Sequence, residues 1–306
     1  MGILSSLFGG SKTDENRQEK QDKKNFEILK YDGMRARNMH QLGYAIKCFE
    51  QASAIQEDNE TLQELANAYI QTGRIDDARI TLDRLIDINP DDIQLYLSLA
   101  QVCYMQEDYE SMLNAAGQAI NIDETNAYAY YAAGQAEHGL KNDLQAIVML
   151  TKAIAHDEHF TRAYLLRGEI LWEMNQLKEA ADDAGLVLST DSDNEDALLL
   201  MGKIQISSRL LQEAETSFNK ILEINPFNEK AYLLKGKLLS EQNELDKAIE
   251  LYTEGLELMP QSTVFYQERG HVRLLKGDKE GSIEDMKKAI ELNPEQEKSI
   301  NGEFKN

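Results

Sequence analysis

The chain has 306 residues, of which 32 are basic and 54 acidic, and its formal net charge is −22. This excess of carboxylates disfavours nucleic acid as a partner, because phosphate binding needs clustered lysine and arginine. It is typical of a soluble surface and weakly favours a basic protein or peptide as a partner.

The N-terminal residues 1–25 differ in composition from the rest of the chain. Ile3, Leu4, Leu7 and Phe8 form an apolar run that is too short for a signal peptide or a membrane span. Residues 12–25 are charged and poor in apolar side chains, and we expect 1–25 to be a flexible tail. Two alternatives stay open: myristoylation at Gly2, because Met-Gly-x-x-x-Ser matches that signal, and an apolar helical face that docks on a partner, a membrane surface or the protein's own groove.

All four prolines of the chain lie on one period. Pro226, Pro260 and Pro294 are 34 residues apart, and Pro90 lies four such periods before Pro226. Proline breaks a helix interior because it lacks an N–H and clashes with the preceding turn, so these residues mark the ends of units. A fixed period of this length predicts a stacked repeat array.

The same residue types recur at fixed places in each unit. The units are 59–92, 93–126, 127–160, 161–194, 195–228, 229–262 and 263–296, preceded by a shorter one over 26–58. The eighth place is always Gly or Ala: Gly33, Ala66, Ala100, Gly134, Gly168, Gly202, Gly236 and Gly270. Twelve residues later a second small residue recurs, and a bulky apolar residue often follows four residues after that. Spacings of three and four residues line one helix face, and small residues let two helices approach closely.

Residues that suit a helix end separate the two halves of a unit. They are Gly73, Asn142, Asn175, Asn243 and Gly277, which tolerate the left-handed conformation that closes a helix. Each unit is therefore predicted to be helix, turn, helix, turn. No window alternates apolar and polar residues for long enough to predict a strand.

These residues resemble the tetratricopeptide repeat, a 34-residue helix–turn–helix with small residues at the eighth and twentieth places and proline near its end. The resemblance covers 26–296 and implies an all-α, right-handed superhelical α-solenoid of about eight repeats. The remaining residues, 297–306, form a C-terminal tail or a partial capping helix. Tyrosine often replaces the usual tryptophan or leucine early in the first helix, and Glu137, Gln205 and Arg273 depart from the aromatic residue usual at the eleventh place.

The resemblance also implies where a partner binds. In related proteins the second, fifth, sixth, ninth, twelfth and thirteenth places of the first helix point into a concave groove. The candidate groove residues are Leu97, Tyr104, Tyr128, Tyr131, Leu165, Trp172, Leu199, Lys203, Leu233 and Lys237. We expect largely apolar binding, with Lys203, Lys230 and Lys237 meeting acidic flanks of the ligand; alternatively, several of the leucines only pack between helices.

Catalytic and metal-binding patterns are weak. The sequence has no glycine-rich phosphate loop, no nucleophile elbow and no His-Glu-x-x-His helix, and we expect neither an enzyme nor a cofactor. His156 and His159 are close enough to suggest zinc, but an inter-repeat turn exposed to solvent is the favoured interpretation. Glu137 is expected to reach water through a slight shift of its helix; a buried Glu137 would need a partner. Cys48 and Cys103 lie in no CxxC motif and are expected to be reduced.

The sequence therefore predicts a cytoplasmic, non-catalytic scaffold that binds a protein or peptide in its concave groove. The alternative is a membrane-proximal assembly factor held by its N-terminal apolar segment, with membrane contact only through residues 1–10. The lysine, asparagine and arginine set with which some tetratricopeptide proteins grip an acidic chaperone tail is missing, so that function is disfavoured.

Overall fold

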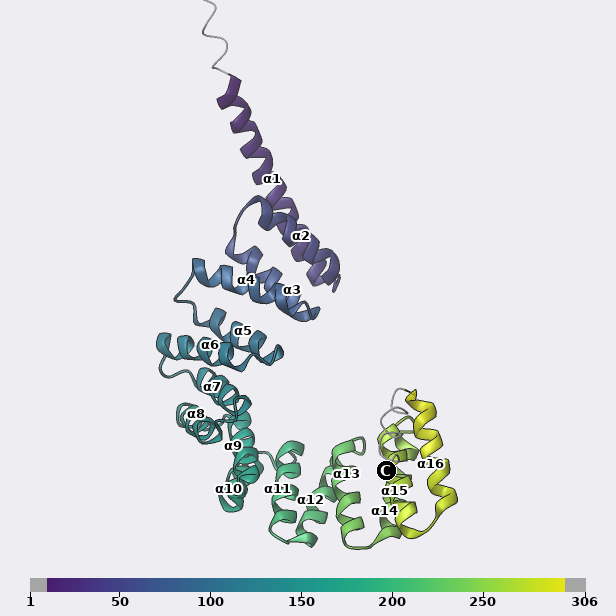
Figure 1. The fold of residues 1–306 in the computed structure, drawn as a ribbon. Coiled ribbons are helices and arrows are strands. Elements are labelled where there is room, and N and C mark those ends of the chain that lie inside the picture. The colour runs from purple at the N-terminus through teal and green to yellow at the C-terminus, as the bar shows by residue number, and fades with distance from the viewer. Residues whose placement is uncertain (1–9, 295–306) are drawn as a thin grey trace, which may run out of the picture. The chain divides into compact units, whose positions relative to one another are not determined.

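The computed structural model describes residues 10–294, with side chains from residue 16 onward, and this part of the chain contains sixteen α-helices and no strand (Figure 1). The helices are α1 (Gly10–Asn38), α2 (Leu42–Ile55), α3 (Asn59–Gln71), α4 (Ile75–Ile88), α5 (Ile93–Met105), α6 (Tyr109–Ile122), α7 (Ala127–Gly139), α8 (Asp143–His156), α9 (Thr161–Glu173), α10 (Leu177–Thr190), α11 (Glu195–Ser207), α12 (Leu211–Ile224), α13 (Glu229–Glu241), α14 (Leu245–Leu258), α15 (Thr263–Lys276) and α16 (Lys279–Leu292). The prediction of an all-α solenoid of helical repeats is confirmed.

The helices fall into two compact units. Helices α1 to α8 belong to the first unit, which ends at His159, and helices α9 to α16 to the second, which begins at Phe160. Within each unit successive helices pack side by side in chain order, two to a repeat (Figure 1). Each unit therefore holds four repeats, and in the described part of the chain each helix packs on its neighbours in the sequence.

A left-handed residue closes the first helix of every repeat. These residues are His40, Gly73, Glu107, Lys141, Asn175, Arg209, Asn243 and Gly277, all with positive φ. The amide after each bonds to the carbonyl five residues earlier, as Arg74 N does to Tyr69 O at 2.9 Å, which is the Schellman motif. The prediction was wrong for Asn142, which lies at the start of α8 with φ −95°, because Lys141 takes the left-handed position with φ 66°.

Short polar side chains begin six of the eight first helices, and prolines follow four of the second ones. Asp58, for example, accepts a hydrogen bond from the backbone N–H of Thr61 at 2.9 Å, which satisfies a donor that the helix leaves free. Asp108 caps α6 in the same way, and its bonds to Ser111 and Arg79 lower its pKa to about 2. Each proline lies two residues beyond the end of α4, α12, α14 or α16, as predicted.

The eighth-place residue sets how closely the two helices of a repeat approach. A Cβ atom added at Gly134 would lie 2.7 Å from Cγ of Leu150, and one added at Gly202 would overlap the ring of Phe218. Leu150 and Phe218 are fully buried. Both follow the glycine by sixteen residues, so the recurring pair of a small and a bulky residue is a direct contact between the helices.

This packing predicts opposite effects for two glycine substitutions. Gly202→Ala should lower the free energy of unfolding by about 1–3 kcal/mol, because the Phe218 ring must move to admit the methyl group. Gly117→Ala in α6 has nothing within 4 Å of the added Cβ and should raise stability by about 0.5–1 kcal/mol, since glycine is unfavourable in a helix interior. Urea unfolding of both variants measures the difference, and equal effects would contradict the packing argument.

Helix α1 corrects the expected boundary of the N-terminal tail. It begins at Gly10, so residues 10–25 are helical rather than flexible. Residues 11–32 contain neither Gly nor Pro, and side-chain bonds four residues apart support the helix, such as Gln18 Nε2 to Asp22 Oδ1 at 2.9 Å. Low apolar content prevents burial but not helix formation. The predictions for the apolar segment, for Gly2 and for the capping helix fall on residues 1–9 and 295–306, outside the described part of the chain.

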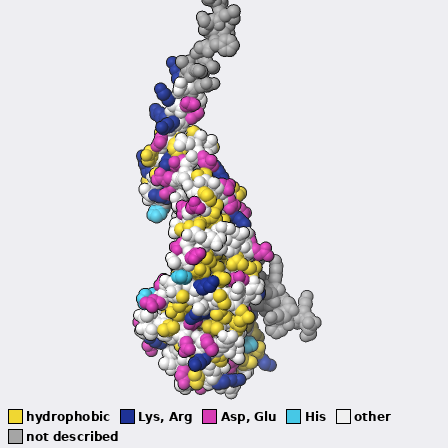
Figure 2. Space-filling model, turned by 90° about the vertical axis from the view of Figure 1, so that its left-hand side faces the viewer, with side chains coloured by type: hydrophobic (Ala, Val, Ile, Leu, Met, Phe, Trp, Pro, Cys, Tyr) yellow, Lys and Arg dark blue, Asp and Glu magenta, His cyan; other side chains and the backbone are white. Residues whose placement is uncertain are grey.

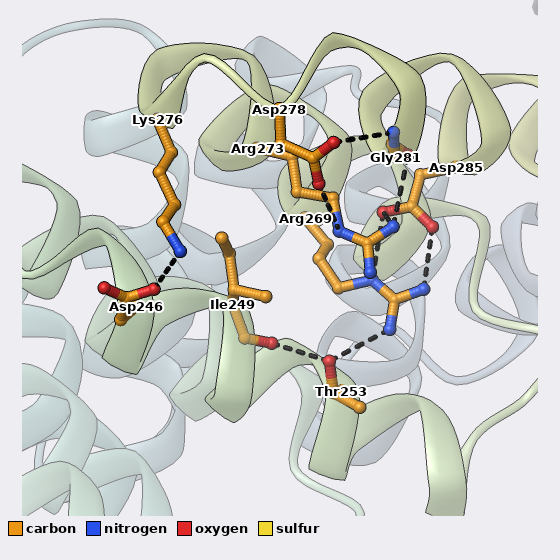
Figure 3. A network of polar contacts seen from close by, with 9 residues as sticks. All are labelled: Asp246, Ile249, Thr253, Arg269, Arg273, Lys276, Asp278, Gly281 and Asp285. Atoms are coloured by element: carbon orange, nitrogen blue, oxygen red, sulfur yellow. Dashed lines mark hydrogen bonds and ion pairs between the residues drawn. The ribbon is translucent and has the colours of Figure 1, made fainter.

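The last repeat is held together by a buried ionic network (Figure 3). Arg269 of α15 makes two hydrogen bonds to the carboxylate of Asp285 in α16, at 2.7 and 3.0 Å, and a third to Thr253 Oγ1 of α14 at 3.0 Å. Arg273 adds an ion pair to Asp285 at 3.0 Å and a hydrogen bond to the carbonyl of Gly281 at 3.1 Å. Asp285 is only 3% exposed, so these donors compensate a fully desolvated charge and fix α15 against α16.

Candidate functional site

The first helices α9, α11 and α13 of the second unit line one face, which we call the first-helix face. Residues one repeat apart meet there: Lys203 Nζ lies 3.0 Å from Oε1 of Glu169, 34 residues earlier. Neighbouring first helices therefore run in matching register, and the variable places of successive repeats form a continuous strip.

Four residues of α9 and α11 build a cluster on this face, which we call the Trp172 cluster: Glu169, Trp172, Lys203 and Ser207. The indole N–H of Trp172 donates to Ser207 Oγ at 2.9 Å, and Ser207 Oγ donates to the carbonyl of Lys203 at 3.1 Å. Lys203 Nζ lies 5.1 Å from the centre of the indole ring, within range of a cation–π interaction. The polar edge of the partly exposed tryptophan is thus satisfied within the protein, which leaves the ring surface that Lys203 does not cover for apolar contact.

The other candidates in the second unit divide between surface and core. Leu165 and Leu233 are partly exposed, and Leu233 also packs against the hydrophobic cluster of α13 to α15. Lys237 is exposed, as is Lys230, and neither makes a hydrogen bond or ion pair with another described residue. Leu199 is only 6% exposed and packs in the core of α11 to α13, so it offers little surface to a ligand.

In the first unit the candidates are mainly tyrosines. Tyr128 and Tyr131 of α7 lie together, with ring centres 6.0 Å apart, and Tyr128 is exposed. Tyr104 of α5 is 47% exposed and meets the edge of the Tyr109 ring. Leu97 is 9% exposed and belongs to a core cluster with alanines of α6 and α7, so it corresponds to the alternative in which a leucine packs between helices.

The sequence raised Glu137, His156 and His159 as candidates for a catalytic or metal site. Glu137 is 8% exposed and accepts a hydrogen bond from Asn142 Nδ2 at 2.9 Å, so the expectation that it reaches water was wrong. His156 stacks on the Tyr130 ring with centres 5.3 Å apart, whereas the His159 side chain is 79% exposed. Among the described residues, no three His, Cys, Asp or Glu side chains lie close enough to hold a metal ion.

Sequence reasoning missed a polar network beside a cavity of about 240 Å³ on α2, α3 and α4. The Tyr69 hydroxyl donates to Glu50 Oε1 at 2.8 Å, and the Arg74 guanidinium lies over the Tyr69 ring at 4.4 Å. Burial and the bond to Glu50 raise the pKa of Tyr69. The partners of Tyr69 satisfy its polar atom internally, so this network explains helix packing rather than ligand binding. Ser207 was missed as well, although its spacing from Trp172 places the two on adjacent repeats.

None of the helices in the described part of the chain combines the length and apolar character needed to cross a membrane.

Comparisons with known proteins agree with the repeat pattern. Tetratricopeptide repeat family models match residues 39–103, 195–228, 217–250 and 264–296, whereas no curated protein matches the sequence. A tetratricopeptide repeat protein from Parabacteroides merdae has a similar fold, with a TM-score of 0.61 at 17% identity over 77% of this chain and 93% of that one. The APC/C hetero-tetramer Cut9–Hcn1 is also similar, with a TM-score of 0.57 at 14% identity over 83% of this chain and 50% of that one. The period, the small-residue contacts and these matches agree that the chain belongs to the tetratricopeptide repeat family, whose members generally act as protein-interaction scaffolds.

Proposed function

We propose that this protein is a non-catalytic scaffold whose first-helix face in the second unit binds a peptide or helix of a partner protein. The observation that carries the proposal is the Trp172 cluster. A partly exposed indole whose N–H is already bonded, with a lysine over its ring, can take an apolar side chain without leaving a polar atom unsatisfied. The free, buried Cys48 and Cys103 fit a reducing compartment, and we place the scaffold in the cytoplasm.

The surroundings of the cluster indicate the chemistry of the ligand. Leu165 and Leu233 add partly exposed apolar surface. Lys230 and Lys237 on α13 are exposed and make no ion pair with a described residue, although the whole chain carries a charge of −22. The ligand that fits combines a bulky apolar side chain, which rests on Trp172, with acidic residues that meet the lysines.

Selection from a displayed random-peptide library tests this proposal. Peptides enriched on the full-length protein should pair an aromatic or aliphatic residue with nearby Asp or Glu. Trp172→Ala should weaken their binding at least tenfold, because a buried aromatic anchor commonly contributes 2 kcal/mol or more. Phe227→Ala removes a 61% exposed aromatic ring from a turn outside the cluster and should leave binding unchanged.

The affinity of one enriched peptide for each variant, measured by titration, decides the outcome. Equal binding by wild type and Trp172→Ala would overturn the proposal. Enrichment of basic peptides whose affinity collapses with salt would assign binding to the acidic surface instead.

Helix α1 favours a second candidate function, that of a factor tethered to a membrane surface. Residues 16–24 lie outside the repeat packing and are almost wholly exposed, and Figure 2 shows Lys and Arg side chains gathered on this part of α1. A helix that is polar on all sides can act as a spacer between a membrane surface and the repeats.

Flotation with phosphatidylcholine vesicles tests the tether. If residues 1–10 bind a bilayer, the full-length protein floats with the vesicles, and a Leu7→Asp, Phe8→Asp variant stays in the dense fraction. The experiment is repeated with vesicles that contain phosphatidylserine, because the Lys and Arg side chains of α1 attract anionic lipid whereas the net charge of −22 opposes it. Wild type that stays in the dense fraction with both kinds of vesicle would exclude this candidate.

A further inference from the structure

The last repeat exposes apolar side chains on its outer side. Ile283 of α16 is 54% exposed, and Met286 and Ile290, three and seven residues further along the same helix, are partly exposed. We call these three residues the end face. Isolated exposed apolar residues need no explanation, but three on one side of a helix do.

The preceding repeat shows which helix covers the same places inside the array. Ile249, one period before Ile283, is partly buried against the cluster that contains Phe265 and Val272 of α15. Phe265 is fully buried, with its ring 5.2 Å from that of Tyr232 and 6.0 Å from that of Tyr252. The same places are covered by the next first helix inside the array. The end face is therefore the receiving half of an inter-repeat interface, and no described residue covers it.

The first repeat does not supply the complementary half. The third and tenth places of later first helices are buried, as Leu95 and Val102 show at 3% and 0% exposure. In α1 the third place is Ile28, but the tenth is Arg35, whose side chain is 73% exposed and pairs with Asp32 at 3.6 Å. Stacking α1 onto the end face of another copy would bury this charge, which is costly without a good partner. Head-to-tail assembly is therefore disfavoured.

Charge distribution favours contact between copies at the end face. The unit 263–296 has six basic and seven acidic residues and 26–58 has four and five, whereas each of the six units between them has at least two more acidic than basic residues. Two copies, each with a net charge of −22, thus repel one another least at the first and last repeats, and the exposed charge of Arg35 disfavours the first. The bonds between Arg269 and Asp285 also hold α16, which carries the end face, against α15 (Figure 3).

We propose that the end face binds the end face of a second copy of this chain in a two-fold symmetric dimer. In such a contact the same patch serves on both subunits, so Ile283 and Met286 of one copy meet the same residues of the other. This contact is separate from the first-helix face and does not depend on what that face binds.

Sedimentation equilibrium of the full-length protein over a wide concentration range tests the dimer. Wild type should show a reversible monomer–dimer equilibrium that strengthens with salt, because screening reduces the repulsion between the acidic chains. Ile283→Glu should raise the dimer dissociation constant at least tenfold. Ile80→Glu places the same charge on an isoleucine that is 61% exposed in α4, and should leave the dissociation constant unchanged.

Each other outcome overturns the proposal. A protein that stays monomeric at every concentration would mean that another part of the chain or a different partner covers the end face. Species larger than a dimer that Ile28→Glu also disrupts would mean head-to-tail stacking. A dimer that Ile283→Glu does not weaken lies elsewhere on the surface. Circular dichroism of the variants confirms that each is as helical as wild type.

Discussion

The close approach of the two helices within each repeat is the contact on which the rest of the structure depends. It requires a Gly or Ala at the eighth place and, in most repeats, is filled by a bulky residue sixteen positions later, as with Gly202 and Phe218. Because this contact recurs with every repeat, it fixes the period and leaves each helix pair with an apolar side that only a neighbouring pair can cover. The left-handed residue after each first helix then turns the chain back at the same point of every repeat.

The same constraint separates residues that support the fold from residues free to serve a function. Places that face a neighbouring helix are occupied mainly by apolar residues and are buried. Places that face outward on the first helices vary between repeats, and in the second unit they bring Trp172, Lys203 and Glu169 together. A regular scaffold can thus carry one irregular surface, and that irregularity is the basis of the proposed binding face.

Much of this fold follows from the sequence because its information is periodic. Proline spacing and small-residue places predicted the helices from 26 onward, since one misread repeat is corrected by seven others. Isolated features were harder to predict. Residues 10–25 were expected to be flexible, because composition reports whether a segment can be buried but not whether it is helical. Lys141, not Asn142, takes the left-handed position, because the register of the helix decides the conformation and residue preference only adjusts its cost.

The candidate site was predicted less well, for a geometric reason. Leu199 and Leu165 occupy the same fifth place, yet Leu199 is buried while Leu165 is partly exposed. Exposure at this place depends on the volume of side chains on the adjacent helices, which a repeat pattern does not specify. Conversely, the hydrogen bond between Trp172 and Ser207 joins two repeats, so it can be predicted only when the register between those repeats is known.

Fluorescence of Trp172 tests the central claim most directly, because it is the only tryptophan in the chain. Its emission and acrylamide quenching are measured on the full-length protein, free and saturated with a bound peptide. If the ring anchors the ligand, saturation shifts the emission to the blue and reduces quenching, since the partly exposed indole loses contact with water. Unchanged emission and quenching at saturation would show that the ligand binds elsewhere and would contradict this account.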